Sequence, residues 1–194
     1  MHHHGSGHPP ILSSLIIIRT RPEYEPRSLI SSLALFTAIK TRRREATFDL
    51  IHARFDPTDT RAAIIEGLVE RIPPGAQLLV RQPVVPAHKM LETAARHDVM
   101  PPLDNTILSK RLPGVTLLPV TLTDEQLHAV GKAHGLEMPE PNATPIMRNR
   151  RAPETAMAMW SIYVKSFCRS PEARSLIAAF QAWRILEKVR PLPF

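Results

Sequence analysis

The order of strand-like and helix-like segments in the N-terminal half constrains the fold of this 194-residue chain more than any other feature. Residues 15–18 (LIII) are apolar and mostly β-branched, which predicts a buried central strand. Two more strands are predicted over residues 29–40 and 45–55, and the short turn between them favours an antiparallel hairpin. A helix beginning near Asp56 and a short apolar strand at residues 78–80 follow. This order of three strands, a helix and a strand predicts an α/β domain.

The remainder of the chain predicts one more strand and several helices. A fifth strand is predicted over residues 115–120, and Thr123 with Gln126 fits a capping box for a helix that ends near His134. A further helix is predicted over residues 88–97. Two C-terminal helices are predicted, one from about Pro153 to Arg169 and one with Ser170 as its N-cap. We therefore expect a disordered tail or tag remnant over residues 1–10, a domain over 11–137, a linker over 138–151 and a helical hairpin over 152–194.

The segments LIIIRTRPEYE, ALFTAIKTRRREATFDLIHARFDPTDTRAAIIEGLVERI and AQLLVRQP resemble the first three strands, first helix and fourth strand of the ribonuclease H-like superfamily. VTLLPVTLTDEQLHAVGKAHGL is similar to the last strand and helix of that fold. The resemblance covers about residues 14–136 and lies in the pattern of segments, not in signature residues. It implies a mixed sheet of three antiparallel strands plus parallel strands, with flanking helices. The right-handed crossover rule permits a fourth strand parallel to the first.

The resemblance also marks four positions at which catalytic members of that superfamily carry metal-binding acids. They are the end of the first strand, the first helix, the end of the fourth strand and the last helix. In this chain residues 19–21, Ala63, residues 81–82 and His128 stand there, and none of these positions is acidic. Arginine and alanine cannot build a site for two Mg²⁺ ions, and cations at such a site repel them. We therefore expect no catalytic residue, no metal site and no cofactor.

The net charge of +7 favours an anionic partner such as nucleic acid or an acidic protein. Two basic clusters are candidates for phosphate contacts, because arginine forks match phosphate oxygens. One lies at the tip of the predicted hairpin, and the other precedes the first C-terminal helix, whose dipole attracts anions. Plainer interpretations are also open: a solvated turn that blunts the sheet edge, or a mobile basic loop. The candidate nucleic-acid-binding residues are Lys40, Arg42, Arg43, Arg44, Arg148, Arg150 and Arg151.

Both tryptophans of the chain lie in the two C-terminal helices, in apolar stripes with spacings of three and four residues. Two interpretations of these stripes are open. They can pack on the sheet or on each other, or they can form a surface for a protein partner or a second copy, where Trp and Phe anchors are favoured. The candidate partner-binding residues are Trp160, Phe180 and Trp183.

The remaining acidic, histidine and cysteine side chains give weaker indications of a metal site or a catalytic nucleophile. Asp49, Asp56, Asp59 and Glu66 leave an unconventional metal site open, although helix capping explains Asp56 and Asp59. The histidines lack metal-ligand spacing. The single cysteine, Cys168, lies in an apolar helical run, which predicts a buried residue and not a thiol nucleophile. One cysteine fits a reducing compartment, and we expect a cytoplasmic protein.

The sequence thus predicts a non-catalytic nucleic-acid-binding accessory protein of ribonuclease H-like fold, with DNA or RNA held through its phosphates. A protein-interaction or scaffold subunit that uses the aromatic C-terminal helices is the first alternative, and a divergent metal-dependent nuclease is the second. No membrane partner is expected, because no apolar stretch approaches the ~20 residues that a membrane-spanning helix needs.

Overall fold

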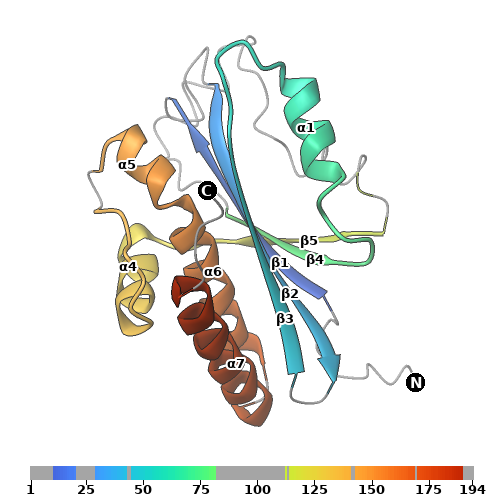
Figure 1. Ribbon diagram of the computed structural model, residues 1–194, viewed down its shortest axis with the longest axis vertical. Coiled ribbons are helices and arrows are strands. Elements are labelled where there is room, and N and C mark those ends of the chain that lie inside the picture. Colours follow the sequence, from blue (N-terminus) through green and yellow to red (C-terminus); the bar gives the residue numbers. More distant parts are fainter. Residues whose placement is uncertain are drawn as a thin grey trace.

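The computed structural model contains a five-stranded sheet with the strand order β3-β2-β1-β4-β5 (Figure 1). Strand β1 pairs antiparallel with β2, and β2 pairs antiparallel with β3. Strand β4 runs parallel to both β1 and β5. The expected antiparallel hairpin and the expected parallel pairing of the first and fourth strands are therefore confirmed. The strands are β1 (Ile11–Arg19), β2 (Ile30–Arg42), β3 (Glu45–Arg54), β4 (Gln77–Arg81) and β5 (Thr116–Val120).

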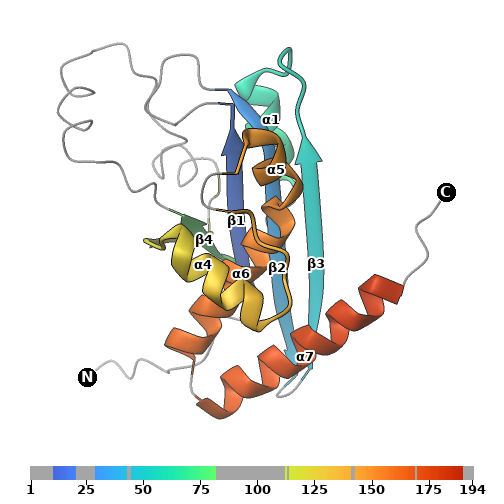
Figure 2. The same cartoon turned by 90° about the vertical axis from the view of Figure 1, so that its left-hand side faces the viewer.

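Helices cover both faces of this sheet, which confirms the α/β class (Figures 1 and 2). Helix α1 lies against one face, and α4, α5, α6 and α7 lie against the other. Each face has its own apolar core, because alternate side chains of a strand point to opposite faces. The helices are α1 (Arg61–Val69), α4 (Asp124–Ala133), α5 (Pro145–Arg150), α6 (Ala152–Phe167) and α7 (Ser170–Val189).

The structure describes residues 11–20, 29–42, 45–81, 112, 114–140, 143–168 and 170–189. Several predictions fall outside this part of the chain: the tail over residues 1–10, the helix over 88–97, and the basic residues Arg43 and Arg44 at the hairpin tip. Among the helices that the structure describes, none has the length and apolar character to cross a membrane.

Strand β1 begins four residues earlier than residue 15, where the apolar run starts. Ser13 and Ser14 are fully buried within it, and both hydroxyls are hydrogen-bonded. The Ser13 hydroxyl lies 2.9 Å from that of Thr37, and the Ser14 hydroxyl donates to the carbonyl of Ala156 at 2.8 Å. A buried hydroxyl is tolerated when it has such a partner. The polar residues therefore extend the strand instead of ending it.

The start of α1 corrects one expectation. Thr60 is its N-cap, and its hydroxyl accepts from the backbone N–H of Ala63 at 3.3 Å. Asp56 and Asp59 belong to the preceding turn, in which the Asp56 carboxylate accepts from the backbone N–H and the hydroxyl of Thr58 at 3.0 and 2.8 Å. These aspartates thus shape the turn and do not cap the helix.

The capping box predicted for α4 is confirmed. The hydroxyl of Thr123 accepts from the backbone N–H of Gln126 at 3.2 Å, and the Gln126 side chain accepts from the backbone N–H of Thr123 at 2.9 Å. Gly135, with a φ of 63°, follows the helix in the left-handed conformation that glycine adopts without strain.

The C-terminal helices share the core of the preceding residues. Helix α6 packs on β1 and β2, and the predicted linker over residues 138–151 contains α5. The rings of Trp160 and Phe180 both lie 5.5 Å from that of Phe36 on β2. All three side chains have no exposed surface. The segment that the sequence separates as a helical hairpin is therefore part of the same folded layer.

We expect Phe36→Ala to lower the free energy of unfolding by about 3–5 kcal/mol, because it removes a fully buried ring that contacts four other rings. Phe167→Ala is the matched control, since that ring is 72% exposed and its loss should change stability by less than about 1 kcal/mol. Urea denaturation followed by far-UV circular dichroism measures both. Equal losses in the two variants would contradict this assignment of the core.

Candidate nucleic-acid interface at the carboxyl end of the sheet

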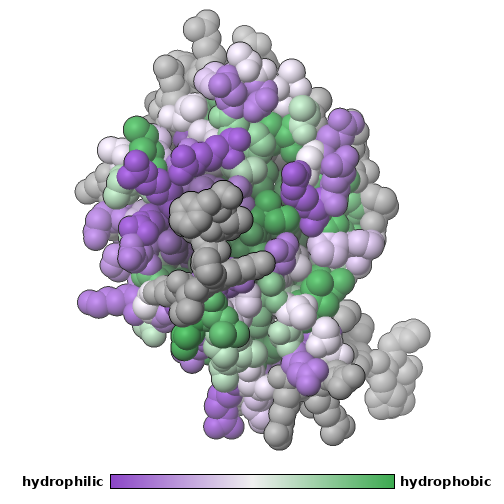
Figure 3. All heavy atoms as spheres, viewed as in Figure 1, coloured by the Kyte–Doolittle hydropathy of each residue, from purple (hydrophilic) through white to green (hydrophobic). Residues whose placement is uncertain are grey.

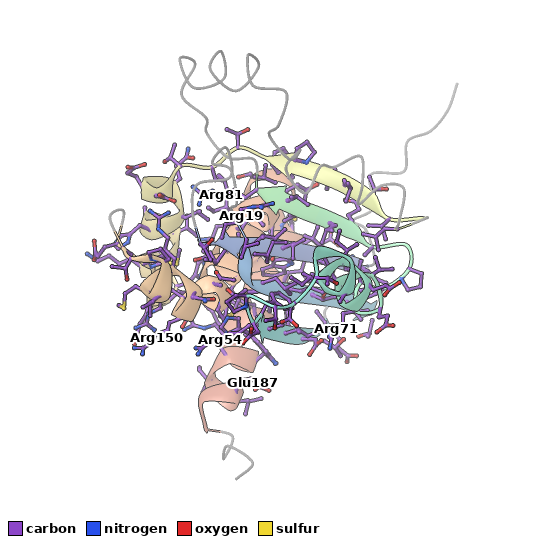
Figure 4. The ribbon with its side chains drawn as sticks, turned by 90° about the horizontal axis from the view of Figure 1, so that it is seen from above. Arg19, Arg54, Arg71, Arg81, Arg150 and Glu187 are labelled. Carbon is purple, nitrogen blue, oxygen red and sulfur yellow. The ribbon has the colours of Figure 1, made fainter. Side chains whose placement is uncertain are left out.

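Three arginines occupy the last positions of strands that run in the same direction. Strand β4 is parallel to β1, and β3 is antiparallel to β2, which is itself antiparallel to β1. Strands β1, β3 and β4 therefore finish at one end of the sheet, with Arg19, Arg54 and Arg81 as their last residues. We call this region the arginine end. Figure 4, seen from above, shows the three side chains there together with Arg150 of α5.

Arg81 has a structural role at the arginine end. Its Nε and Nη2 donate to the carbonyl of Leu122 at 3.2 and 3.0 Å, and Nη2 also donates to Asp124 Oδ1 at 2.7 Å. Asp124 is the first residue of α4, so Arg81 joins the end of β4 to the beginning of that helix. Arg19 also takes part in an interaction within the chain. These two positions, marked by the resemblance as acid positions, carry cations that the fold itself uses.

Arg54 lies next to α5, on the face of the sheet that the C-terminal helices cover. His52, two residues earlier on β3, forms a hydrogen bond with the backbone of Asn149. Burial and the charge of Arg54 both lower the pKa of His52, whereas this hydrogen bond raises it. Because His52 bonds to the backbone of Asn149, α5 comes close to the end of β3, and Figure 4 shows Arg54 and Arg150 on the same side of the molecule as seen from above.

The arginines of α5 differ in what they contact. Thr144 caps this helix, and Arg148 and Arg150 stand exposed in its last turn, where cations complement the helix dipole. Arg151 forms ion pairs with Glu137 and Glu154, so it fastens the junction between α5 and α6. In the described part of the chain no ion pair joins Arg54 or Arg150 to another residue. These two side chains can therefore bind an external anion.

The arginine end is rich in hydrogen-bond donors. Figure 3 shows hydrophilic side chains gathered over the side of the molecule that α4 and α5 occupy. A guanidinium group offers five N–H donors in a planar fork and never loses its charge near neutral pH. Burial and Arg54 together favour the neutral form of His52. Such an arrangement can bind phosphate or carboxylate groups.

The hairpin tip lies at the other end of the sheet. Lys40 forms an ion pair with Glu172 in the first turn of α7, so it is engaged within the chain. The side chains of Arg42, Arg43 and Arg44 lie outside the described residues. Ten residues of β3 separate the tip from Arg54, which is about 30 Å of extended strand. Lys40, the residue of this cluster whose side chain the structure describes, therefore lies far from Arg54 along the sheet.

The acidic residues do not assemble into a metal site in the described part of the chain, where no group of three or more His, Cys, Asp or Glu side chains could hold a metal ion. Asp49 lies exposed on β3 and Glu66 lies exposed on α1. Hydrogen bonds from the backbone and hydroxyl of Thr58 lower the pKa of Asp56 and hold its carboxylate in the turn. Ala63 is exposed on α1, and His128 is half-buried on α4.

Cys168 and the aromatic residues have structural positions. Burial, with a smaller contribution from Glu172, raises the pKa of Cys168 to about 12, so its thiol stays protonated and is a poor nucleophile. Trp160 and Phe180 have no exposed surface, and Trp183 is half-buried in the same cluster. The structure therefore shows these aromatic side chains packed on the sheet, which is one of the two interpretations of the apolar stripes. A partner could reach Trp160 and Phe180 only if α7 moved.

Arg54 is the residue of the arginine end that the sequence did not single out. The sequence did contain an indication of its role, because Arg54 is the last residue of its strand, as Arg19 and Arg81 are of theirs. Only the strand directions reveal that the three strands end on the same side of the sheet.

Comparisons of the chain with protein families, with curated proteins and with solved structures found no match.

Replacing Arg81, which is hydrogen-bonded within the fold, and Arg54, which has no ion-pair partner among the described residues, should change the stability of the protein by different amounts. We expect Arg81→Gln to lower the free energy of unfolding by about 1–2 kcal/mol, because it removes one charged hydrogen bond and leaves the Leu122 carbonyl without its donor. Arg54→Gln should change it by less than about 0.5 kcal/mol. Urea denaturation at moderate salt gives both values, and equal effects would show that the two arginines have the same role.

Proposed function

We propose that this protein binds nucleic acid without cleaving it, and that its sheet has the ribonuclease H-like arrangement. The order β3-β2-β1-β4-β5, with two antiparallel and two parallel pairings, supports the fold part of this proposal. The binding part rests on one observation. Arg54 and Arg150 are both exposed, and neither has an ion-pair partner among the described residues.

Phosphate is the chemical group that these residues suit best. Bidentate guanidinium–phosphate contacts are strong, and a net charge of +7 adds long-range attraction for a polyanion. Arg54 and Arg150 offer two guanidinium forks on this side of the molecule, so more than one phosphate of a strand can be held. Contacts of this kind position the backbone and do not read bases. Binding should therefore depend little on sequence.

The arginines at the acid positions argue against nuclease chemistry. Arg19 ends β1 and Arg81 ends β4, and a cation there opposes a divalent metal ion. Arg81 uses Asp124, the carboxylate nearest to it, in an ion pair. The carboxylates that would hold such a metal ion are therefore replaced at these two positions by arginines that the fold itself uses.

The hairpin tip stays a second predicted contact. Arg42, Arg43 and Arg44 are the residues proposed for this contact, and they lie in the sequence between β2 and β3 or at the end of β2. Lys40 contributes less to such a contact, because Glu172 already neutralises it. Separate variants of the two ends therefore report on separate contacts.

We expect the double variant Arg54→Gln, Arg150→Gln to weaken binding of labelled DNA and RNA oligonucleotides equally for all sequences. The slope of log K against log salt should become shallower by about one unit per lost phosphate contact. Fluorescence anisotropy between 50 and 200 mM salt, roughly the range over which such contacts weaken strongly, measures this. The matched control is Lys132→Gln, Arg174→Gln, which removes the same charge from exposed positions on α4 and α7.

Wild-type protein that shows no binding at low salt would reject this proposal, and so would equal weakening in the control pair. A variant with alanine at residues 42–44 measures the contribution of the hairpin tip by itself. Incubating the same oligonucleotides with Mg²⁺ or Mn²⁺ tests the alternative of a divergent nuclease. We expect them to remain intact, whereas cleavage that disappears in Asp56→Asn would establish that alternative.

The exposed end of α7 favours a protein-interaction subunit as a second candidate. Ile185 and Leu186 are 65% and 70% exposed, and Figure 2 shows α7 extending past the edge strand β3. Apolar side chains of this size are frequent at interfaces between copies and between partners. This candidate uses the outer face of α7 and leaves the packed aromatic residues in place.

If α7 mediates association, Leu186→Glu should convert an oligomer into a monomer without loss of folding, because the side chain is exposed. Size-exclusion chromatography with light scattering measures the mass. Trp183→Ala serves for comparison, since it perturbs the aromatic cluster that α7 packs into. A strictly monomeric wild type that captures no partner in a pull-down would count against this candidate.

A further inference from the structure

His134 is a buried histidine whose ring has no hydrogen-bond partner among the described residues. It follows α4, is only 8% exposed, and neither Nδ1 nor Nε2 contacts a donor or acceptor in that part of the chain. The ring of Phe180 lies 6.3 Å from the imidazole. A neutral imidazole in an apolar setting tolerates this arrangement far better than an imidazolium ion, which carries two N–H donors and a full charge.

Cations surround the imidazole on the elements that pack against it. Arg184 of α7 donates through Nη1 to the carbonyl of His134 and through Nη2 to the carbonyl of Gly135 at 3.0 Å. Lys165 of α6 acts on the imidazole with the same sign of charge. Glu154 of α6 faces Arg184 and offsets part of its charge, whereas the charged groups that act on the imidazole itself among the described residues are both cations. A proton on His134 would therefore add a third positive charge to Arg184 and Lys165.

Helix α7 is the element that can move to relieve this repulsion. Its first turn is tied to β2 by the Lys40–Glu172 ion pair, and its middle is held by Phe180. Beyond Phe180, its side chains are exposed or half-buried, and Arg184 supplies the link to α4. Helix α6, in contrast, is buried along most of its length.

We propose that protonation of His134 releases the part of α7 beyond Phe180 from the segment that follows α4 and uncovers the edge of the aromatic cluster at Trp183 and Phe180. The positive charge on the imidazole is accommodated when water reaches the ring, and water reaches it when Arg184 and the part of α7 beyond Phe180 withdraw. The ion pair at the start of α7 keeps the helix attached. The result is a hinged helix that closes over an aromatic surface at neutral pH and opens in acid. This device does not depend on nucleic-acid binding.

The direction of the pH dependence follows from linkage. Burial, Lys165 and Arg184 lower the pKa of His134 in the closed state below its ordinary value of 6.5. The open state therefore takes up the proton more readily than the closed state. Closure is stable above pH 6.5 and weakens as the pH falls below it.

Tryptophan fluorescence of the full chain tests the proposal, because both tryptophans lie in the cluster that α7 covers. Between pH 8 and about pH 5, roughly the window of histidine titration, we expect the emission to shift to longer wavelength and iodide quenching to increase. The far-UV circular dichroism should keep the sheet and helix signals. His134→Phe should remove the transition, and His128→Gln on α4 should leave it unchanged.

Lys165→Glu provides a second variant at an exposed position that folding tolerates. It replaces repulsion by attraction, so the transition should move to lower pH even if His134→Phe fails to fold. Tryptophan emission that stays constant down to about pH 5 in the wild type would overturn the proposal, because a histidine would be protonated there. A transition with the same midpoint in Lys165→Glu would also overturn it, as would loss of the circular dichroism signal together with the emission change.

Discussion

Aromatic packing between the C-terminal helices and the β2–β3 hairpin is the interaction on which the rest of this structure depends. Phe36 contacts Phe48, Trp160, Phe180 and Trp183, with ring centroids 5.5–5.9 Å apart. Burying each large ring contributes about 1.5–3 kcal/mol, and edge-on ring pairs add further stabilisation. This cluster holds α6 against the sheet. Because α5 immediately precedes α6, the same packing positions α5 at the arginine end.

The directions of the strands turn scattered arginines into a site. A parallel crossover brings the end of β4 beside the end of β1, and the hairpin returns the end of β3 to the same side. Arg81 is engaged there by Leu122 and Asp124, whereas Arg54 and Arg150 have no ion-pair partner among the described residues. Arg81 thus stabilises the fold at this end of the sheet, and we propose that Arg54 and Arg150 bind an anion.

Local chemistry predicted the parts of the fold that depend on neighbours in the chain. The capping box of Thr123 and Gln126 and the hairpin between β2 and β3 are short-range patterns, and both were predicted correctly. The start of β1 was missed, because Ser13 and Ser14 are polar and their partners Thr37 and Ala156 are distant in sequence. The cap of α1 was placed on aspartates that instead form the preceding turn, since Asp, Ser and Thr side chains serve turns and caps alike.

The sequence by itself determined the α/β class, the order of the strands along the chain and the presence of arginines at the ends of β1 and β4. These properties follow from residue type and periodicity, which act over a few residues. Only the tertiary structure decided that Trp160 and Phe180 are core residues, that Lys40 is paired with Glu172, and that the hairpin tip and α5 lie at opposite ends of β3. Burial, ion pairing and distance depend on contacts between segments far apart in the chain, and no local pattern of residues specifies which segments meet.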